Sequence, residues 1–133
     1  MFNDKRIRVI HKAIDLAEGR YRMNINLSID VATTDNQTFL TVKGEIDAYT
    51  APLLKEKLLP ATAKEAEKIV VDLNDVTYMD STGLGVFISA LKSTKEHGST
   101  LTLVNLQERV HRLFKITSLD SIISIDTTTR GGE

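Results

Sequence analysis

Residues 78–85 read YMDSTGLG and place a carboxylate, two hydroxyl groups and two glycines between a run of strand-forming and a run of helix-forming residues. The first backbone N–H groups of a helix have no partner within it, so Ser81 or Thr82 can act as a cap at this junction, and Gly83 allows a close approach. A hydroxyl at a helix start is also open to modification, because the positive end of the helix dipole favours an added phosphate, although the Asp80 carboxylate opposes it. The motif alone favours the cap, but a cap does not require all five groups together.

Enzymatic hypotheses fit the motif poorly. A nucleophile elbow needs glycine where the chain has Met79, and a P-loop needs lysine where it has Val86. A dinucleotide fingerprint needs a further glycine where Ile88 stands, and a magnesium-binding receiver needs acidic residues where 31–34 read VATT. The histidines have no metal-ligand spacing: His11, His97 and His111. We therefore expect no catalytic residue, no metal and no cofactor, and a serine hydrolase has little support.

Composition narrows the class of protein. A length of 133 residues with 41% hydrophobic residues fits one domain with one core. The chain has no cysteine, which fits a reducing cytoplasm, and no apolar run resembles a membrane span or a signal peptide. Of 17 basic and 18 acidic residues, six and three precede Met23, so the remainder holds 11 and 15. A mildly acidic body with 5% aromatic residues argues against a nucleic-acid surface. We expect a cytoplasmic protein that binds neither nucleic acid nor a membrane.

The organised part of the chain begins with two strands. Apolar and polar residues alternate over 23–31, which predicts a half-buried strand. Turn-forming residues at 35–37 lead into a second strand at 39–42, which we expect to end at Gly44. The two strands suggest a hairpin at a sheet edge.

A helix is predicted next. Thr50 can cap its free amide groups, and Pro52 falls in the first turn, where a missing N–H costs nothing. Pro60 lies inside the helical pattern, so we expect a kink or break near Leu59. The apolar stripe consists of Leu54, Leu58 and Ala61.

Two further strands and two helices complete the pattern. Residues 69–73 show no alternation, so we expect a central strand covered on both faces, and 100–104 form another strand. Helical spacing links Leu84, Phe87, Ile88 and Leu91, with Gly98 as the stop. Asn105 and Glu108 resemble a capping box before a helix whose apolar face is Val110, Leu113 and Phe114. A last short helix is expected within 118–123. The order predicts an α/β fold with a small mixed sheet.

Three segments resemble the STAS domain of bacterial anti-sigma factor antagonists, in particular the RsbV type that controls the general stress sigma factor B. They read GEIDAYTAP at 44–52, VTYMDSTGLGVF at 76–87 and ERVHRLFKITSL at 108–119. The similarity extends from about Met23 to Ile125, although Ser118 stands where relatives often carry glycine. It implies the STAS fold, with a mixed sheet of four to five strands and crossover helices packed on it, in a STAS domain at 23–127. Residues 128–133 are expected to form a flexible tail, because chain ends are often poorly ordered.

The resemblance also implies a partner-switching cycle. The unphosphorylated antagonist binds an anti-sigma factor that is a serine kinase, which releases the sigma factor for stress-response transcription. Phosphorylation on Ser81, with Thr82 as the reserve, abolishes binding, and a PP2C-type phosphatase reverses it. The chain is then a substrate and a binding switch, and not an enzyme. The alternative is a structural or ligand-sensing STAS unit within a larger assembly.

Residues of two loops are expected to form the docking surface for the kinase. The loops after the second and third strands emerge at the same end of a parallel crossover unit, which brings Asp47 and Tyr49 towards Ser81. For Asp47, a solvated carboxylate or an alternative cap is as good an interpretation as docking, whereas an aromatic residue in a polar loop, Tyr49, favours a partner. Met79 is expected in the core, and Asp80 is expected to orient the turn. The predicted docking residues are Asp47, Tyr49, Thr50, Asp80, Ser81, Thr82, Gly83 and Leu84.

Residues 1–22 lie outside the resemblance and form a basic extension with six basic and three acidic residues. Ile7, Ile10 and Ile14 fall at helical spacing, so a basic amphipathic helix on a membrane or a partner is conceivable. We favour the hypothesis that the extension results from the choice of start site. Residues 18–20 can be encoded by GAAGGGAGA, a purine-rich ribosome-binding sequence just before Met23.

Overall fold

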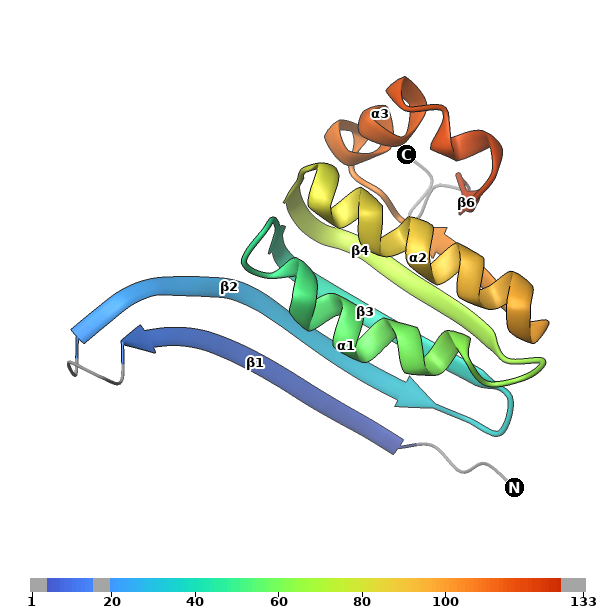
Figure 1. Ribbon diagram of the computed structural model, residues 1–133, viewed down its shortest axis with the longest axis horizontal. Coiled ribbons are helices and arrows are strands. Elements are labelled where there is room, and N and C mark those ends of the chain that lie inside the picture. The colour runs from blue at the N-terminus through green and yellow to red at the C-terminus, as the bar shows by residue number, and fades with distance from the viewer. Residues whose placement is uncertain (1–4, 16–19, 128–133) are drawn as a thin grey trace.

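The computed structural model describes residues 5–15 and 20–127, and its side chains from Leu27 onwards. Within these residues one sheet of six strands carries the helices (Figure 1). The elements are β1 (Lys5–Asp15), β2 (Arg20–Thr33), β3 (Gln37–Ile46), α1 (Ala51–Thr62), β4 (Lys68–Met79), α2 (Ser81–His97), β5 (Thr100–Val104), α3 (Glu108–Ile116), the single 3-10 turn η1 (Leu119–Ser121) and β6 (Ser124–Asp126).

The strands lie in the sheet in their chain order, from β1 at one edge to β6 at the other. The pairs β1–β2 and β2–β3 are antiparallel, whereas β3–β4, β4–β5 and β5–β6 are parallel. Helices α1 and α2 are the crossovers that parallel neighbours require. The predicted α/β class with a mixed sheet is confirmed: β2 to β6 are five strands, within the expected number, and β1 adds a sixth.

The strand at the start of the organised chain follows its alternation. Leu27 and Ile29 of β2 are buried, and the residues that alternate with them, Ser28 and Asp30, are half-buried. The next strand is longer than predicted, because β3 continues past Gly44 to Ile46. Gly44 has φ of 120° beside a shift in the β3–β4 register, a conformation that glycine adopts without strain. The glycine therefore marks a bulge, and not the end of the strand.

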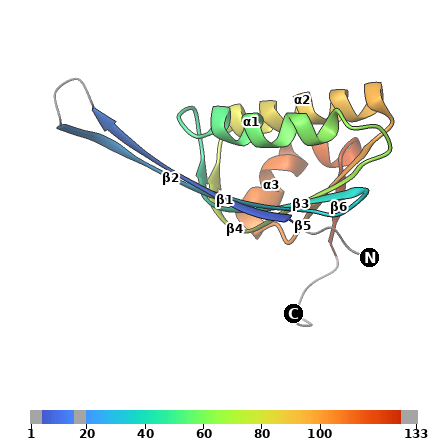
Figure 2. The same ribbon diagram turned by 90° about the horizontal axis from the view of Figure 1, so that it is seen from below.

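The central strand β4 is covered on one face only, contrary to the prediction. Ile69, Val71 and Leu73 are fully buried, whereas Val70 and Asp72 are half-buried. Figure 2 shows α1 and α2 together on one side of the sheet. The apolar run at 69–71 has no polar interruption because Val70, on the more open face, is itself apolar. A β-branched side chain suits a pleated strand even where no helix covers it.

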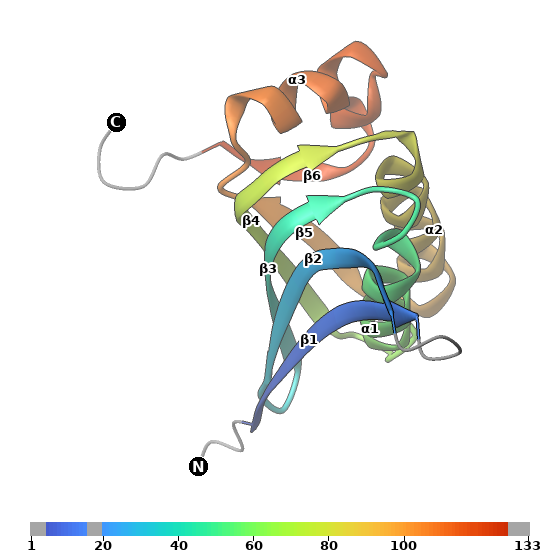
Figure 3. The ribbon, with the colours of Figure 1, turned by 90° about the vertical axis from the view of Figure 1, so that its left-hand side faces the viewer.

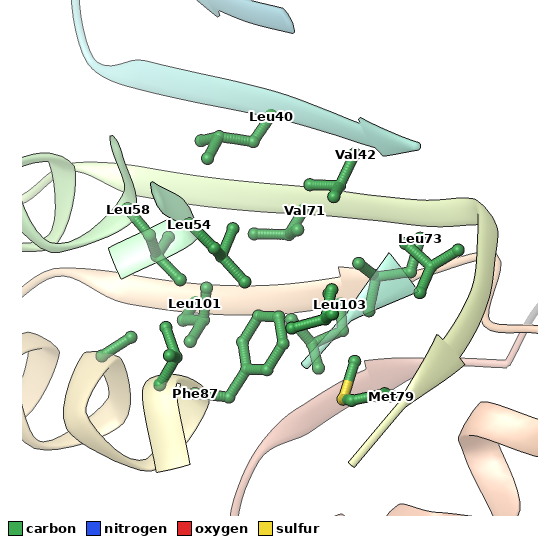
Figure 4. Packing of buried hydrophobic residues seen from close by; sticks show 14 of the residues in the cluster. Leu40, Val42, Leu54, Leu58, Val71, Leu73, Met79, Phe87, Leu101 and Leu103 are labelled. Atoms are coloured by element: carbon green, nitrogen blue, oxygen red, sulfur yellow. The ribbon is translucent and has the colours of Figure 1, made fainter. Parts of the chain in front are cut away.

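The core lies between this covered face of the sheet and the helices (Figure 4). Phe87 of α2 points towards Leu101 and Leu103 of β5. Its ring also contacts Phe114 of α3, with 6.0 Å between the ring centroids and 58° between the planes. This aromatic contact joins the third helix to the same core.

Two predicted helix starts were wrong in detail. Thr50 precedes α1, but its side chain makes no cap bond to the helix. Helix α3 begins after Gln107, and Asn105 instead adopts a left-handed conformation with φ of 61°, so the expected capping box does not form. Asparagine tolerates this conformation better than most residues, which explains its place at the end of β5.

Of the kink or break predicted near Leu59, the break is wrong, because α1 continues through Pro60 to Thr62. A proline removes one backbone hydrogen bond from a helix, and here it lies only two residues before the helix ends. At the other end of the chain, the short helix expected within 118–123 is the single turn η1. Ser118 before it has φ of 63°, in the left-handed region that favours glycine.

The leader forms a strand, so the amphipathic-helix hypothesis is wrong. β1 pairs with β2 from Lys5 opposite Thr33 to Asp15 opposite Arg20. β2 itself begins three residues before the predicted Met23. The start-site hypothesis and the flexible tail at 128–133, which lies outside the described residues, stay predictions. No helix in the described part of the chain is long and apolar enough to cross a membrane.

Replacing Ala66 with glycine should stabilise the fold by about 0.5–1 kcal/mol, since Ala66 has φ of 60° and a Cβ is unfavourable there. The control Ala63→Gly lies at the end of α1 with φ of −83°, where glycine only adds backbone entropy to the unfolded chain. Both side chains are exposed. Urea midpoints should therefore move in opposite directions, and a lower midpoint for Ala66→Gly would contradict the backbone conformation.

Candidate functional site

The site forms where two neighbouring parallel strands end. Ile46, the last residue of β3, lies opposite Met79, the last residue of β4. The backbone N–H of Asp80 donates to the carbonyl oxygen of Ile46 at 3.2 Å. The loop after β3 and the start of α2 therefore emerge side by side, at the left of Figure 1, as the sequence predicted.

Asp80 is the cap of α2. Its Oδ1 accepts hydrogen bonds from the backbone N–H of Thr82 at 2.9 Å and from that of Gly83 at 3.4 Å. The same oxygen accepts from the hydroxyl of Thr82. The carboxylate thus satisfies two of the free amides of the first turn and holds the neighbouring hydroxyl.

Ser81 is not the cap. It is the first residue of α2, its side chain is exposed, and its hydroxyl forms no hydrogen bond within the described residues. Thr82 is also exposed, but its hydroxyl already donates to Asp80. Of the two hydroxyls, that of Ser81 is the one available to another molecule.

Gly83 allows the first turn of α2 to lie close against the strand ends. A Cβ on this residue would be 2.7 Å from Cγ of Met79 and 2.8 Å from Cγ2 of Ile46. Both side chains are buried, and Ile46 is branched and fully enclosed. Only glycine fits here, whereas a Cβ on Gly85 would meet nothing within 4 Å.

The loop after β3 is organised by a second aspartate. Oδ1 of Asp47 accepts from the backbone N–H of Tyr49 at 2.9 Å and from that of Thr50 at 3.1 Å. The hydroxyl of Thr50 donates to the carbonyl oxygen of Glu45 at 2.7 Å and accepts from the N–H of Asp47 at 2.9 Å. The Thr50 side chain therefore closes the loop and does not cap the helix that follows. This ordered loop presents Tyr49 with 60% of its surface exposed.

The predicted docking residues are brought to one edge of the sheet, but they divide into two groups. Three of them are buried within the domain: Thr50, Gly83 and Leu84. The other five are at least partly accessible: Asp47, Tyr49, Asp80, Ser81 and Thr82. We call these five the docking surface. Met79 is buried, as expected.

Two exposed residues beside this surface were missed. Tyr78 lies opposite Glu45 in the β3–β4 register, and both side chains are exposed. The sequence could have indicated that Tyr78 is exposed, because it precedes Met79, which was expected in the core, and neighbouring residues in a strand point to opposite faces. Together with Asp47 and Asp80, Glu45 gives this edge of the sheet an acidic character. No cluster of metal-ligating side chains occurs among the residues described.

The architecture is that of a small α/β domain that presents an exposed serine and an ordered acidic loop on one edge of its sheet. The model of the STAS domain family matches residues 28–131, and the chain belongs to this family. Two curated relatives share one name. A Bacillus subtilis (strain 168) protein named anti-sigma-B factor antagonist is 46% identical over 108 residues, covering 81% of this chain and 98% of the relative. A Listeria monocytogenes protein of the same name is 50% identical over 103 residues, covering 77% and 90%.

Solved structures agree with the fold. The crystal structure of a putative anti-sigma factor antagonist from Thermotoga maritima superposes with a TM-score of 0.67 at 30% identity, covering 74% of this chain and 85% of that one. The anti-sigma factor antagonist SpoIIAA in its unphosphorylated form superposes with a TM-score of 0.59 at 15% identity, covering 76% and 89%. At that identity the second likeness shows the fold alone.

Gly83→Ala should destabilise the domain by about 1–3 kcal/mol, because the added methyl group overpacks the contact with Met79 and Ile46. Gly85→Ala is the matched control on the same helix, where the open space and the higher helix propensity of alanine predict a gain of up to about 1 kcal/mol. Chemical denaturation of both variants measures the difference. Equal stabilities would show that the first turn of α2 can move away from the strand ends.

Proposed function

We propose that this protein is an antagonist of an anti-sigma factor that is also a serine kinase, and that phosphorylation of Ser81 switches the complex off. The observation that carries the proposal is the hydroxyl of Ser81, exposed and without a hydrogen bond in the described structure, beside an ordered loop that presents Tyr49. The shared name of the Bacillus and Listeria relatives supports the antagonist role.

The charge of a phosphate explains how one hydroxyl can control binding. Phosphorylation adds about −1.5 to −2 charges at neutral pH. Asp80 already occupies the backbone amides of Thr82 and Gly83, which would otherwise be the natural partners of a phosphate at a helix start. A phosphate on Ser81 therefore stays at the surface, close to the acidic side chain of Asp80. The added negative charge would then lie in the interface with the bound kinase and weaken the complex.

Ser81 is a better acceptor than Thr82 for a local reason. Phosphorylation of Thr82 would break the hydrogen bond from its hydroxyl to Asp80 and place a phosphate against that carboxylate. Ser81 has no such bond to lose, and its side chain lies one residue before the hydroxyl that Asp80 holds. Thr82 thus helps to fix the turn that presents Ser81.

In the proposed cycle the unphosphorylated protein binds the kinase, and the sigma factor held by the kinase is released. The kinase transfers the γ-phosphoryl group of ATP to the Ser81 oxygen, the hydroxyl proton leaves to a base of the kinase, and ADP departs. A PP2C-type phosphatase hydrolyses the phosphoserine and restores the hydroxyl. The protein is the substrate of both enzymes, and the sigma factor it serves is one of the sigma B type that directs a stress response.

Incubation with the cognate kinase and ATP, followed by mapping with mass spectrometry, should place phosphate on Ser81 and abolish the complex. Ser81→Ala should bind the kinase but take up no phosphate, because the fold does not use this hydroxyl. Thr82→Ala is the control for the neighbouring position and should still be phosphorylated on Ser81. Phosphate on Thr82 of the unaltered protein would contradict the assignment. Neither phosphate nor complex would instead favour a structural STAS unit within an assembly.

Tyr49→Ala should weaken binding of the kinase by roughly tenfold or more, since exposed aromatic residues often dominate interfaces. The free energy of unfolding should change by less than about 0.5 kcal/mol, because Tyr49 is 60% exposed. Ile122→Ala is the matched control, because Ile122 is also an exposed large side chain, 55% exposed, and lies directly after η1 and outside the docking surface. Calorimetric titration of both variants measures the difference, and equal affinities would remove Tyr49 from the interface.

A further inference from the structure

The paired strands β1 and β2 extend past the sheet at the docking end. The β2–β3 pairing ends with Leu27 opposite Gly44, and β3 itself ends two residues later at Ile46. β2 begins at Arg20, so residues 20–24 lie beyond the end of β3. At about 3.3 Å per residue, this projection is roughly 15 Å long.

β1 accompanies β2 over this projection. Beyond His11 opposite Leu27, the pairing continues through Ala13 opposite Met23 to Asp15 opposite Arg20. We call residues 12–15 of β1 and 20–26 of β2 the arm. Figures 2 and 3 show the paired strands bending towards the layer of helices at the end where α1 and α2 begin. The arm and the docking surface thus share one end of the molecule.

The charges of the arm and the docking surface are opposite in sign. The arm contains Lys12, Arg20 and Arg22 against Asp15, a net charge of +2. The edge beside it carries the carboxylates of Asp47 and Asp80. A partner that contacts both segments therefore needs negative charge towards the arm and positive charge towards the carboxylates.

The arm is an addition to the family pattern. The STAS model matches residues 28–131, so it begins after the arm. The Bacillus relative is covered over 98% of its length by an alignment that takes in only 81% of this chain. A partner that recognises the docking surface alone does not need the arm. The position of the arm beside that surface therefore needs a separate explanation.

We propose that the arm is a second contact for the anti-sigma factor kinase, and that it binds an acidic patch of the kinase beside the site that receives Ser81. The inference rests on the proposed function. It is the alternative to the start-site hypothesis for residues 1–22. The arm projects from the end of the sheet at which the docking surface lies, so one partner can contact both. Because the arm is positively charged, the patch of the kinase that binds it should be acidic. The attraction between them should speed association at low salt.

The test compares binding of the purified kinase to the full chain and to three variants, at low and at physiological salt. Removal of residues 1–22 should weaken binding roughly tenfold, and so should the double variant Arg20→Glu with Arg22→Glu. The double variant changes the net charge of the arm from +2 to −2, so the salt dependence of the association rate should reverse, with faster association at physiological than at low salt. The matched control is Lys5→Glu with Arg6→Glu, which reverses two charges opposite Thr33 and Ala32 at the far end of β2. It should bind within about twofold of the full chain and leaves Arg8, opposite Asp30, unchanged.

The outcomes separate the two proposals. If the full chain does not bind the kinase, the proposed function fails and the inference fails with it. If the full chain binds and is phosphorylated on Ser81, but both arm variants bind equally well, the inference alone is overturned. The charge variant guards against a truncated chain that does not fold. Intact mass of the protein from its native host should include residues 1–22, and a mass that begins at Met23 would overturn the inference.

Discussion

The close contact between the first turn of α2 and the ends of β3 and β4 is the constraint on which the candidate site depends. Gly83 has no side chain because Met79 and Ile46 occupy the space that a Cβ would need. The N–H of Asp80 is tied to the carbonyl oxygen of Ile46 across the same strand ends. Parallel pairing of β3 and β4 puts the loops that follow them at the same end of the sheet. The Gly83 contact then fixes how closely the start of α2 lies against the two strand ends. The position of Ser81 relative to Tyr49 follows from both.

The two loops use the same device at equivalent positions in the sheet. Asp47 and Asp80 each follow the last residue of a strand, and each carboxylate accepts from the backbone N–H groups two and three residues ahead. The Asp80 carboxylate also accepts from the hydroxyl of Thr82, whereas the hydroxyl of Thr50 gives its proton to the Glu45 carbonyl and lies 3.3 Å from Asp47. Aspartate makes such local bonds readily, which explains its place here. The carboxylates therefore order the loops, and the side chains that each loop leaves free are Tyr49 and Ser81.

Much of the fold could be predicted from local patterns. Alternation gave β2, the apolar spacing gave α1 and α2, and the order of elements gave a mixed α/β sheet. The errors fall where long-range contacts decide. The run at 69–73 could not reveal that one face of β4 lacks a helix, because Val70 suits either environment. The apolar residues of the leader are compatible with a helix in isolation, and only pairing with β2 makes them a strand.

The site was predictable in its location but not in its division of roles. Parallel crossover geometry was enough to bring the two loops together. Which residue caps α2 could not be read from the sequence, because Asp80, Ser81 and Thr82 are all good caps. The register of the helix decides it, since α2 starts at Ser81 and leaves Asp80 in the extended conformation that a cap requires. The buried state of Thr50 likewise depends on its bond to Glu45, which lies five residues earlier.

These roles favour a switch that acts on binding rather than on folding. A helix cap contributes about 0.5–2 kcal/mol, and Asp80 supplies it whether or not Ser81 carries a phosphate. The Ser81 hydroxyl makes no hydrogen bond in the described structure, so phosphorylation removes no bond from the fold. Like charges brought together in an interface, by contrast, cost several kcal/mol. The larger effect of the proposed phosphorylation would therefore fall on the complex, because no hydrogen bond of the described fold depends on the Ser81 hydroxyl.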